Sequence, residues 1–184
     1  MLLSKLRMNS CAKATDLSPL TGMPLKYLDL NGCNELTDLR PLKGMSLLTE
    51  LYMISCFKIS DLEPLRGLPL QTLKMPSTSV RSLEPLRNMP LKDLDIYQIA
   101  AIQDLSPLKG MPLTDLHMQN CPKISDLTPL DGMKLKSFGF TPKYIEKGMD
   151  VLRRMESLRT ITVDRDSFPA DVFWNRYTAG EFRK

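Results

Sequence analysis

Histidine, tryptophan and cysteine are scarce in this sequence, with one, one and four copies in 184 residues. A single histidine leaves little material for acid and base catalysis, which needs positioned partner groups. Four cysteines are too few to indicate the disulfide framework of a small secreted domain. These scarcities argue against the usual histidine-centred enzymes and against a disulfide-stapled scaffold.

Long apolar runs and blocks of like charge are also missing. No stretch approaches the roughly 18 apolar residues that a membrane-spanning helix needs, and the N-terminal MLLSKLRMNS lacks the apolar region of a signal peptide. The 25 Lys and Arg residues exceed the 21 Asp and Glu residues by a net charge of only +4. We therefore expect no membrane insertion, no nucleic-acid partner and a cytoplasmic location.

A short string centred on proline recurs along the chain. TDLSPL at residues 15–20 returns as TDLRPL, SDLEPL, RSLEPL, QDLSPL and SDLTPL, with prolines spaced by 22, 23, 21, 22 and 22 residues. Between the prolines lies a leucine, two variable residues and an alternating apolar stretch, as in Leu25 and Leu28-Asp29-Leu30. Alternation predicts a strand with one buried face, and a period near 22 is typical of leucine-rich repeats.

The position after each strand is filled by a residue suited to a narrow turn. These residues are Cys33, Cys56, Thr78, Ile99 and Cys121, and the match of Leu3, Leu6 and Met8 to the template adds Cys11. We predict that all four cysteines are reduced, point inward and make weak hydrogen bonds to the neighbouring turns. Zinc binding by Cys11, Cys33 and Cys56 is the alternative, but their spacing is the repeat spacing and lacks close cysteine pairs. No metal and no cofactor are expected.

The proline string predicts a short turn on the opposite side of each repeat. Ser18 is expected to cap it, Pro19 suits its first position and Gly22 ends it. The predicted fold is therefore α/β, a right-handed leucine-rich-repeat solenoid. A parallel sheet forms its concave side, and short 3-10 or helical turns form its convex side. Recurring methionines at 23, 45, 89, 111 and 133 are interpreted as core, with a ligand-binding methionine stripe as the alternative.

The template divides the chain into residues 1–140, the solenoid, and residues 141–184, a C-terminal cap. Within the cap, Thr141 and Pro142 are expected to begin a helix that continues to Met155, and a strand follows near Ile161. A terminal helix over Pro169–Tyr177 carries Phe173, Trp174 and Tyr177. Its aromatic residues either close the apolar interior or dock a partner.

The template is already running at Leu3. Two explanations stand open: the chain is a piece of a longer protein, or its first repeat is covered by a partner or a second copy. Exposed repeat interior favours self-association, so we expect some association through this first repeat.

The turn Asp16-Leu17-Ser18-Pro19-Leu20 in a 22-residue unit resembles the internalin-like class of bacterial leucine-rich repeats. The variant P-L-x-G-M-P-L at Pro107–Leu113 is similar to repeats of planctomycete-type proteins, in several of which the repeats follow a serine/threonine kinase domain. The ending PADVFWNRY is similar to their chain ends. The resemblance covers essentially the whole chain and implies a binding or regulatory region of a larger signalling protein, because no kinase motif is present. Export and an N-terminal cap, common among internalin-like proteins, have no counterpart here, so adhesion is not expected.

Side chains that alternate with the strand leucines do not pack in the core. They form one continuous surface, since neighbouring strands lie about 4.8 Å apart. We predict a non-catalytic interaction module that binds a protein partner there. A structural scaffold or spacer without a specific ligand is the alternative. Large aromatic and apolar residues are the usual interface anchors. The predicted partner-binding residues are Tyr27, Tyr52, Ile54, Lys74, Asp95, Tyr97 and His117.

Catalysis remains the other alternative. His117 has Asp95 and Asp115 nearby in the template, which are the groups that acid and base chemistry uses. Neither aspartate supplies a nucleophile or an oxyanion hole, and Cys121 belongs to the turn. We therefore expect no enzymatic activity.

Overall fold

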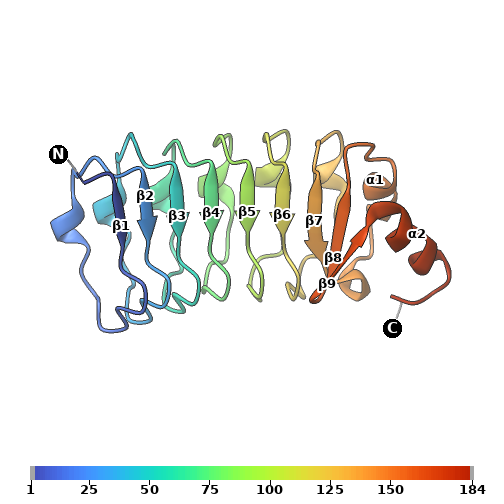
Figure 1. Cartoon of the computed structure of the whole chain (residues 1–184), viewed down its shortest axis with the longest axis horizontal. Helices are drawn as coiled ribbons and strands as arrows, with labels where there is room; N and C mark the ends of the chain where they lie inside the picture. The colour runs from blue at the N-terminus through green and yellow to red at the C-terminus, as the bar shows by residue number, and fades with distance from the viewer. Residues whose placement is uncertain (1–2, 183–184) are drawn as a thin grey trace.

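A computed structural model describes residues 3–182 as a shallow arch of stacked repeats (Figure 1). Residues 1–2 and 183–184, which fall within the predicted bounds of the solenoid and the cap, lie outside the described residues. One nine-stranded sheet runs through the chain, and its strand order is the chain order. The strands are β1 Lys5–Arg7, β2 Tyr27–Asp29, β3 Glu50–Tyr52, β4 Thr72–Lys74, β5 Asp93–Asp95, β6 Asp115–His117, β7 Ser137–Phe140, β8 Thr160–Val163 and β9 Asp166–Pro169.

The central residue of each early strand points into the repeat and sets the register. Leu28 pairs with Leu51, and Leu51 pairs with Leu73 in parallel. All three leucines are completely buried. Because side chains alternate along a strand, burial of the central leucine places its two neighbours on the opposite face. The predicted parallel sheet with one buried face is confirmed.

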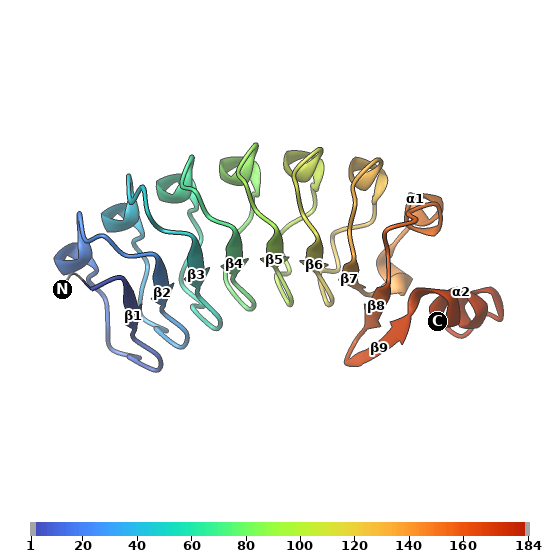
Figure 2. The same ribbon diagram turned by 45° about the horizontal axis from the view of Figure 1, so that its top comes forward.

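Short 3-10 turns lie on the outer side of the arch, as Figure 2 shows, and the strands line the inner side. Each turn has proline among its first two residues, where the missing N–H costs nothing. Gly22 follows the first turn with φ +74°, a conformation that suits glycine. The turns are η1 Ser18–Leu20, η2 Arg40–Leu42, η3 Glu63–Leu65, η4 Glu84–Leu86, η5 Ser106–Leu108 and η6 Thr128–Leu130.

The residue that caps these turns differs from the prediction. Ser18 caps nothing; its backbone N–H and hydroxyl both donate to Asp16, at 2.7 Å each. The backbone N–H of Arg40 donates to Asp38 in the same way, at 2.8 Å. Asx turns of this kind satisfy the first free N–H from two residues upstream. The aspartate of the D-L-x-P-L string is thus the capping residue, and the prediction for Ser18 was wrong.

The interior repeats the same side chains from one turn to the next. Among the recurring methionines, Met45, Met89, Met111 and Met133 are buried, whereas Met23 is half-buried against the same core. Leu68 takes this position in the one repeat without a methionine. The interpretation of these methionines as core residues agrees with their burial.

Three cysteines form a ladder inside the arch. The thiols of Cys33, Cys56 and Cys121 are buried and donate to carbonyl oxygens of the preceding repeat at 3.4, 3.1 and 3.1 Å. Cys11 is exposed, so the prediction that all four point inward was wrong for this residue. Its strand β1 pairs only with β2 among residues 3–182, and no earlier repeat offers its thiol a carbonyl there. All four cysteines are free.

Beyond β7 the predicted helix from Pro142 to Met155 is divided. A 3-10 turn, η7 Pro142–Tyr144, and a short helix, α1 Met149–Arg153, are separated by an extended stretch. In that stretch Lys147 pairs with Asp126 of the preceding repeat in a parallel bridge. Backbone hydrogen bonds to a neighbouring repeat therefore prevail over the local helical spacing. Thr141 does not cap a helix; its hydroxyl accepts the backbone N–H of Asn120 at 2.9 Å.

The last elements close the arch. The predicted strand near Ile161 is β8, parallel to β7, and the predicted terminal helix is α2 Ala170–Thr178. The sequence interpretation missed β9, which pairs antiparallel with β8. Phe173 is fully buried and packs against the rings of Phe140 and Trp174. Since the sheet runs unbroken through β9, the division at residue 140 stays a prediction.

Candidate functional site

The outward side chains on the inner side of the arch form three columns, which we call the concave face. The first column holds the first residue of each strand, the second column holds the third residue, and the third column holds the residue two positions after the strand. Register pairs align the columns from strand to strand, as in Asp29 with Tyr52 and Asp95 with His117. Most outward positions of β1 to β6 change from one strand to the next, with the paired aspartates that begin β5 and β6 the exception, whereas the buried leucines behind them repeat.

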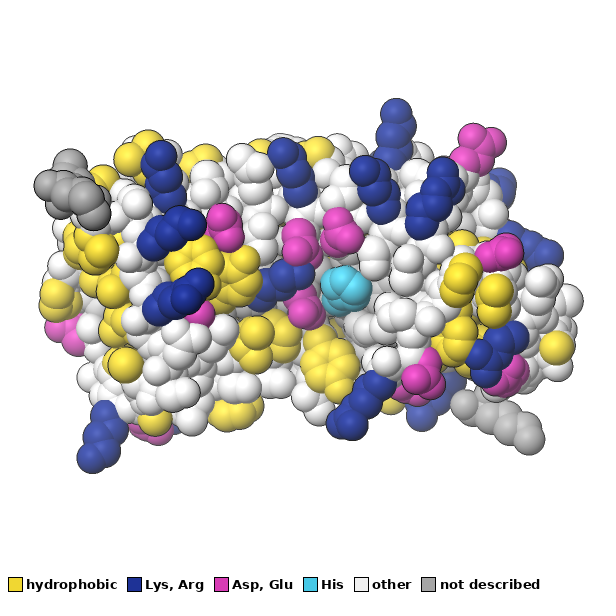
Figure 3. All heavy atoms as spheres, in the orientation of Figure 1, with side chains coloured by type: hydrophobic (Ala, Val, Ile, Leu, Met, Phe, Trp, Pro, Cys, Tyr) yellow, Lys and Arg dark blue, Asp and Glu magenta, His cyan; other side chains and the backbone are white. Residues whose placement is uncertain are grey.

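At the N-terminal end, aromatic and basic side chains gather over β1 to β3 (Figure 3). The ring centroids of Tyr27 and Tyr52 lie 5.2 Å apart. The charged groups of Lys5 and Arg7 lie 6.0 and 5.5 Å from the Tyr27 ring centroid. Ile54 is 38% exposed beside them. We call these five residues the tyrosine patch.

Buried and half-buried carboxylates hold the patch in place. Asp29 is only 5% exposed and accepts hydrogen bonds from the Asn9 amide at 2.7 Å and the Asn31 backbone at 3.0 Å. The Tyr52 hydroxyl donates to Glu50 at 3.1 Å. Burial, followed by this hydrogen bond and the charge of Glu50, raises the pKa of Tyr52 to about 12. The Tyr52 hydroxyl is therefore a fixed neutral donor at physiological pH.

Carboxylates gather over β5 and β6, around the single histidine (Figure 3). We call Asp93, Asp95 and Asp115 with His117 the acidic patch. Lys74 forms an ion pair with Asp93. One oxygen of Asp95 accepts the Tyr97 backbone N–H at 2.9 Å. Burial raises the pKa of Asp95, against the opposing effects of the Tyr97 hydrogen bond and of Lys74 and His117.

The predicted site residues fall into two groups on one surface. Tyr27, Tyr52 and Ile54 lie together in the tyrosine patch. Lys74, Asp95 and His117 lie on adjacent strands at or beside the acidic patch. Tyr97 follows β5, and its hydroxyl accepts the Asn120 amide at 3.2 Å. The structure thus places all seven on the concave face, but it does not bring them into one cluster.

Gln119 is a residue that the sequence interpretation counted only as an outward position. It is 5% exposed and its Oε1 has no hydrogen-bond partner in the described residues. A Cβ added at Gly139 would lie 2.5 Å from the Gln119 amide, so the glutamine side chain fills the space that Gly139 leaves. The glycine of Phe138-Gly139-Phe140 is the sequence signal for this packing, because none of the other described strands has a glycine at its third position.

Catalytic groups are not assembled on this face. Within residues 3–182 the side chain of His117 makes no hydrogen bond or ion pair, and its backbone carbonyl accepts the Ile96 N–H of the neighbouring repeat at 2.8 Å. Burial raises the pKa of the Cys121 thiol to about 11, which disfavours a reactive thiolate. No group of three or more His, Cys, Asp and Glu residues in the described part of the chain is arranged for a metal ion.

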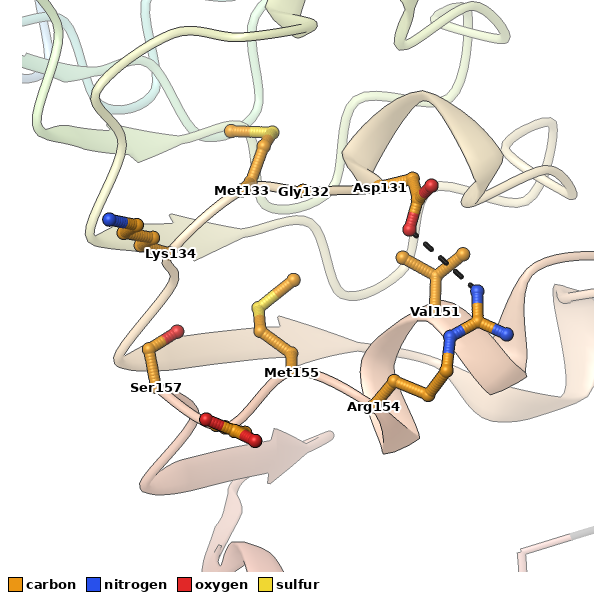
Figure 4. A pocket seen from close by; sticks show the side chains of 9 residues that line it. Asp131, Gly132, Met133, Lys134, Val151, Arg154, Met155 and Ser157 are labelled. Atoms are coloured by element: carbon orange, nitrogen blue, oxygen red, sulfur yellow. Dashed lines mark ion pairs between the residues drawn. The ribbon is translucent and has the colours of Figure 1, made fainter.

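A separate pocket of about 400 Å³ opens where α1 replaces the usual 3-10 turn (Figure 4). Met133, Val151 and Met155 contribute its apolar lining. On its rim Arg154 pairs with Asp131 at 3.7 Å. Lys134 and Glu156 also line the pocket, so its charged side chains are of mixed sign.

Comparisons with known proteins identify the type of repeat. A family described as leucine-rich repeats in two copies matches residues 25–67. Internalin C2 from Listeria monocytogenes is 33% identical with a TM-score of 0.66, and the match covers 74% of this chain and 60% of that one. An internalin designated inlF, from the same species, is 25% identical with a TM-score of 0.63, covering 89% and 55%. No curated protein matches the chain.

The fold is therefore that of a leucine-rich-repeat solenoid, an open and mostly parallel sheet with short 3-10 turns. Its structural similarity is to bacterial internalins, of which it spans just over half the length. Among residues 3–182, no helix combines the length and apolar character needed to cross a membrane.

Proposed function

We propose that this chain is a non-catalytic module that binds a protein partner through its concave face. The observation that carries the proposal is the contrast between repeated inward residues and varied outward residues on the same strands. Solenoids of stacked repeats present extended surfaces of this kind for binding. No described element of the chain covers the strands over β2 to β6 (Figure 2).

The aromatic residues of the face are its candidate anchors. Tyr52 is held by its neighbour Tyr27 at a centroid distance of 5.2 Å and by its hydrogen bond to Glu50. Tyr97 is held by the Asn120 amide. Side chains fixed before binding lose little conformational entropy when a partner arrives, so these tyrosines are suited to carry affinity.

The wider setting of the module is part of the same proposal. The sequence resemblance to kinase-associated bacterial repeats supports a place in a larger regulatory or signalling protein. A cytoplasmic location, with reduced cysteines, fits the three buried thiols and the one exposed thiol. Self-association through β1 stays a prediction.

Photocrosslinking followed by calorimetry tests the proposal. A photoreactive phenylalanine analogue at position 97 should crosslink a partner in extracts of the source organism, whereas the same analogue at Arg87, which follows η4 on the convex side, should not. Mass spectrometry then identifies the partner, and titration calorimetry with purified protein measures Tyr52→Ala, Tyr97→Ala and Arg87→Ala.

We expect each tyrosine variant to lose about 1 to 3 kcal/mol of binding free energy, which is the range for interface anchors. Arg87→Ala should bind as the unaltered chain does, because its charge is paired with Glu84 away from the concave face. If both tyrosine variants bind with full affinity, the concave face is not the binding surface.

A further inference from the structure

Charged side chains on the convex side of the solenoid and at the N-terminal end of its concave face differ in their ion pairs. On the convex side Arg66 pairs with Glu63, and Arg87 pairs with Glu84, each within one turn of the chain. On the concave face Lys5 and Arg7 form no ion pair among the described residues. Charges that serve only solubility are usually interspersed in sign. On the concave face the exposed cations lie on β1, whereas carboxylates predominate over β5 and β6.

The exposed charges at the N-terminal end of this face are positive, whereas the carboxylates of Asp29 and Glu50 there are buried and half-buried. Lys5 and Arg7 are both exposed, and their only contacts of note are with the Tyr27 ring. The adjacent carboxylates of Asp29 and Glu50 already accept hydrogen bonds within the patch. Two cations over an aromatic pair are therefore available to a partner that brings carboxylates and an apolar side chain.

The middle of the face carries negative charge. Among the outward strand positions of β4 to β6, Lys74 is the only Lys or Arg residue, and it forms an ion pair with Asp93. Neither Asp95 nor Asp115 forms an ion pair among the described residues, although Lys74 acts on Asp95 from a greater distance. Half-burial of Asp95 means that water solvates it poorly, so a cation from a partner would replace hydration that is already partly lost.

We propose that the partner is a protein segment that crosses the strands with its own charges in opposite order. Its carboxylates lie over β1 and β2, and a lysine or arginine lies over the acidic patch. This inference rests on the proposed function and specifies the chemistry and direction of its ligand. Charge complementarity of this kind selects a partner and fixes its orientation.

The spacing of the strands sets the spacing of those charges. Between β1 and β5 lie four steps of about 4.8 Å, or roughly 19 Å. An extended segment rises about 3.3 Å per residue, so roughly six residues separate the two charged groups. The tyrosines and Ile54 lie between them. A polyanion of one sign, such as a nucleic acid, would meet the acidic patch and be repelled there.

Three synthetic ten-residue peptides test this inference. The bipolar peptide has three glutamates, a Leu-Trp-Leu-Ser centre and three arginines; the acidic and basic controls carry glutamates or arginines at both ends. Binding to the full chain is measured by fluorescence anisotropy. Contacts are located from backbone amide shifts of the nitrogen-15-labelled chain.

The bipolar peptide should bind at least tenfold more tightly than either control at low salt, and the preference should shrink at high salt as the charges are screened. The acidic control should shift amides of β1 to β3, and the basic control should shift amides of β5 and β6. The double variant K5E/R7E should lose the first set, and D95N/D115N should lose the second set.

Equal affinities for the three peptides, shifts at the same residues for both controls, or no binding by any peptide would overturn the inference. These outcomes leave the concave face itself open, because that is decided by the natural partner's response to Tyr52→Ala and Tyr97→Ala. Loss of that response with an intact peptide preference would overturn the proposed function instead.

Discussion

The interior and the concave face are formed by alternate side chains of the same strands, yet the inward side chains are nearly constant and the outward side chains vary. Inside, Leu28, Leu51 and Leu73 repeat without change and are fully buried. Outside, the paired positions Asp29, Tyr52 and Lys74 differ at every step. Close packing restricts the first set, since each inward side chain must fill the space between its neighbouring repeats. The second set is free of that restriction, so its side chains can differ from one strand to the next.

Phe173→Ala should give the largest loss of stability, about 3 to 5 kcal/mol, which is typical for deletion of a buried aromatic ring. Phe173 lies at the centre of the terminal cluster, stacked on Phe182 at 5.1 Å and on Tyr177 at 5.7 Å. Chemical denaturation measures the change. Val172→Ala is the matched control, because Val172 is 40% exposed on the same helix. Equal losses for the two variants would contradict the assignment of Phe173 to the core.

Gly148→Ala should rank next. Gly148 has φ +82°, and an added Cβ would lie 2.7 Å from the Thr128 backbone nitrogen. The left-handed conformation alone costs about 1 to 2 kcal/mol for a residue with a side chain, and the backbone contact adds to this. Gly110→Ala, at φ +73° with nothing within 4 Å, should show the conformational cost alone. Thermal unfolding of both variants distinguishes the conformational cost from the cost of the backbone contact. A smaller loss of stability for Gly148→Ala than for Gly110→Ala would contradict the assigned contact at Gly148.

The cysteine ladder is expected to contribute less. Cys56→Ala should cost about 1 kcal/mol, because it removes a buried thiol and its 3.1 Å hydrogen bond to Leu30, whereas Cys11→Ala should cost almost nothing. Burial raises the pKa of Cys56 to about 11, so its thiol should resist reagents in the native state. Thiol titration should count one rapid group in the folded chain and four after denaturation. Rapid reaction of two or more native thiols would show that the ladder is open.

Asp95→Asn should stabilise the chain slightly at neutral pH. Burial raises the pKa of Asp95, so the folded state holds its proton at a pH where the unfolded state has released it. The cost of the buried charge is therefore present above the folded pKa and is relieved as pH falls through it. The asparagine variant, which keeps an acceptor for Tyr97, should melt higher at pH 7 and lose that advantage in acid.

Asp16→Asn is the opposite case. Hydrogen bonds from Ser18 lower the pKa of Asp16, so its stabilising effect is present at neutral pH and is lost as pH falls below its ordinary range. This variant should melt slightly lower than the unaltered chain at pH 7. Shifts of the same sign for both variants would contradict the assigned causes.

Most of the fold could be predicted from the sequence because each repeat makes its strand and turn from local residues. Pro19 and Gly22 bound the first turn, and the alternation around Leu28 identifies the buried face. What escaped prediction depends on neighbouring repeats. Cys11 occupies the same template position as Cys56, yet it is exposed because the described residues place a neighbouring repeat on only one side of it. The apolar spacing after Pro142 predicted one helix, but Lys147 instead forms a parallel bridge with Asp126 of the preceding repeat.

The candidate site was predicted as a set of outward positions but not as an arrangement. Alternation places Tyr52 and Asp95 on one face, whereas the separation of tyrosine and acidic patches depends on which strands stack together. The sequence does not distinguish Asp16 from Ser18 as the cap of this turn, because aspartate and serine are both preferred capping residues. The packing of Gln119 over Gly139 needed the register between β6 and β7.

If the concave face binds a partner while the interior holds the fold, Tyr52→Ala should separate the two roles, and one paired measurement tests this most directly. Melting temperature and affinity for the crosslinked partner are measured on the same preparation. Tyr52 is half-buried on the face and fills no interior space, so the melting temperature should stay nearly unchanged while binding weakens by about 1 to 3 kcal/mol. Unchanged affinity, or a loss of affinity that follows a loss of folding, would contradict the account.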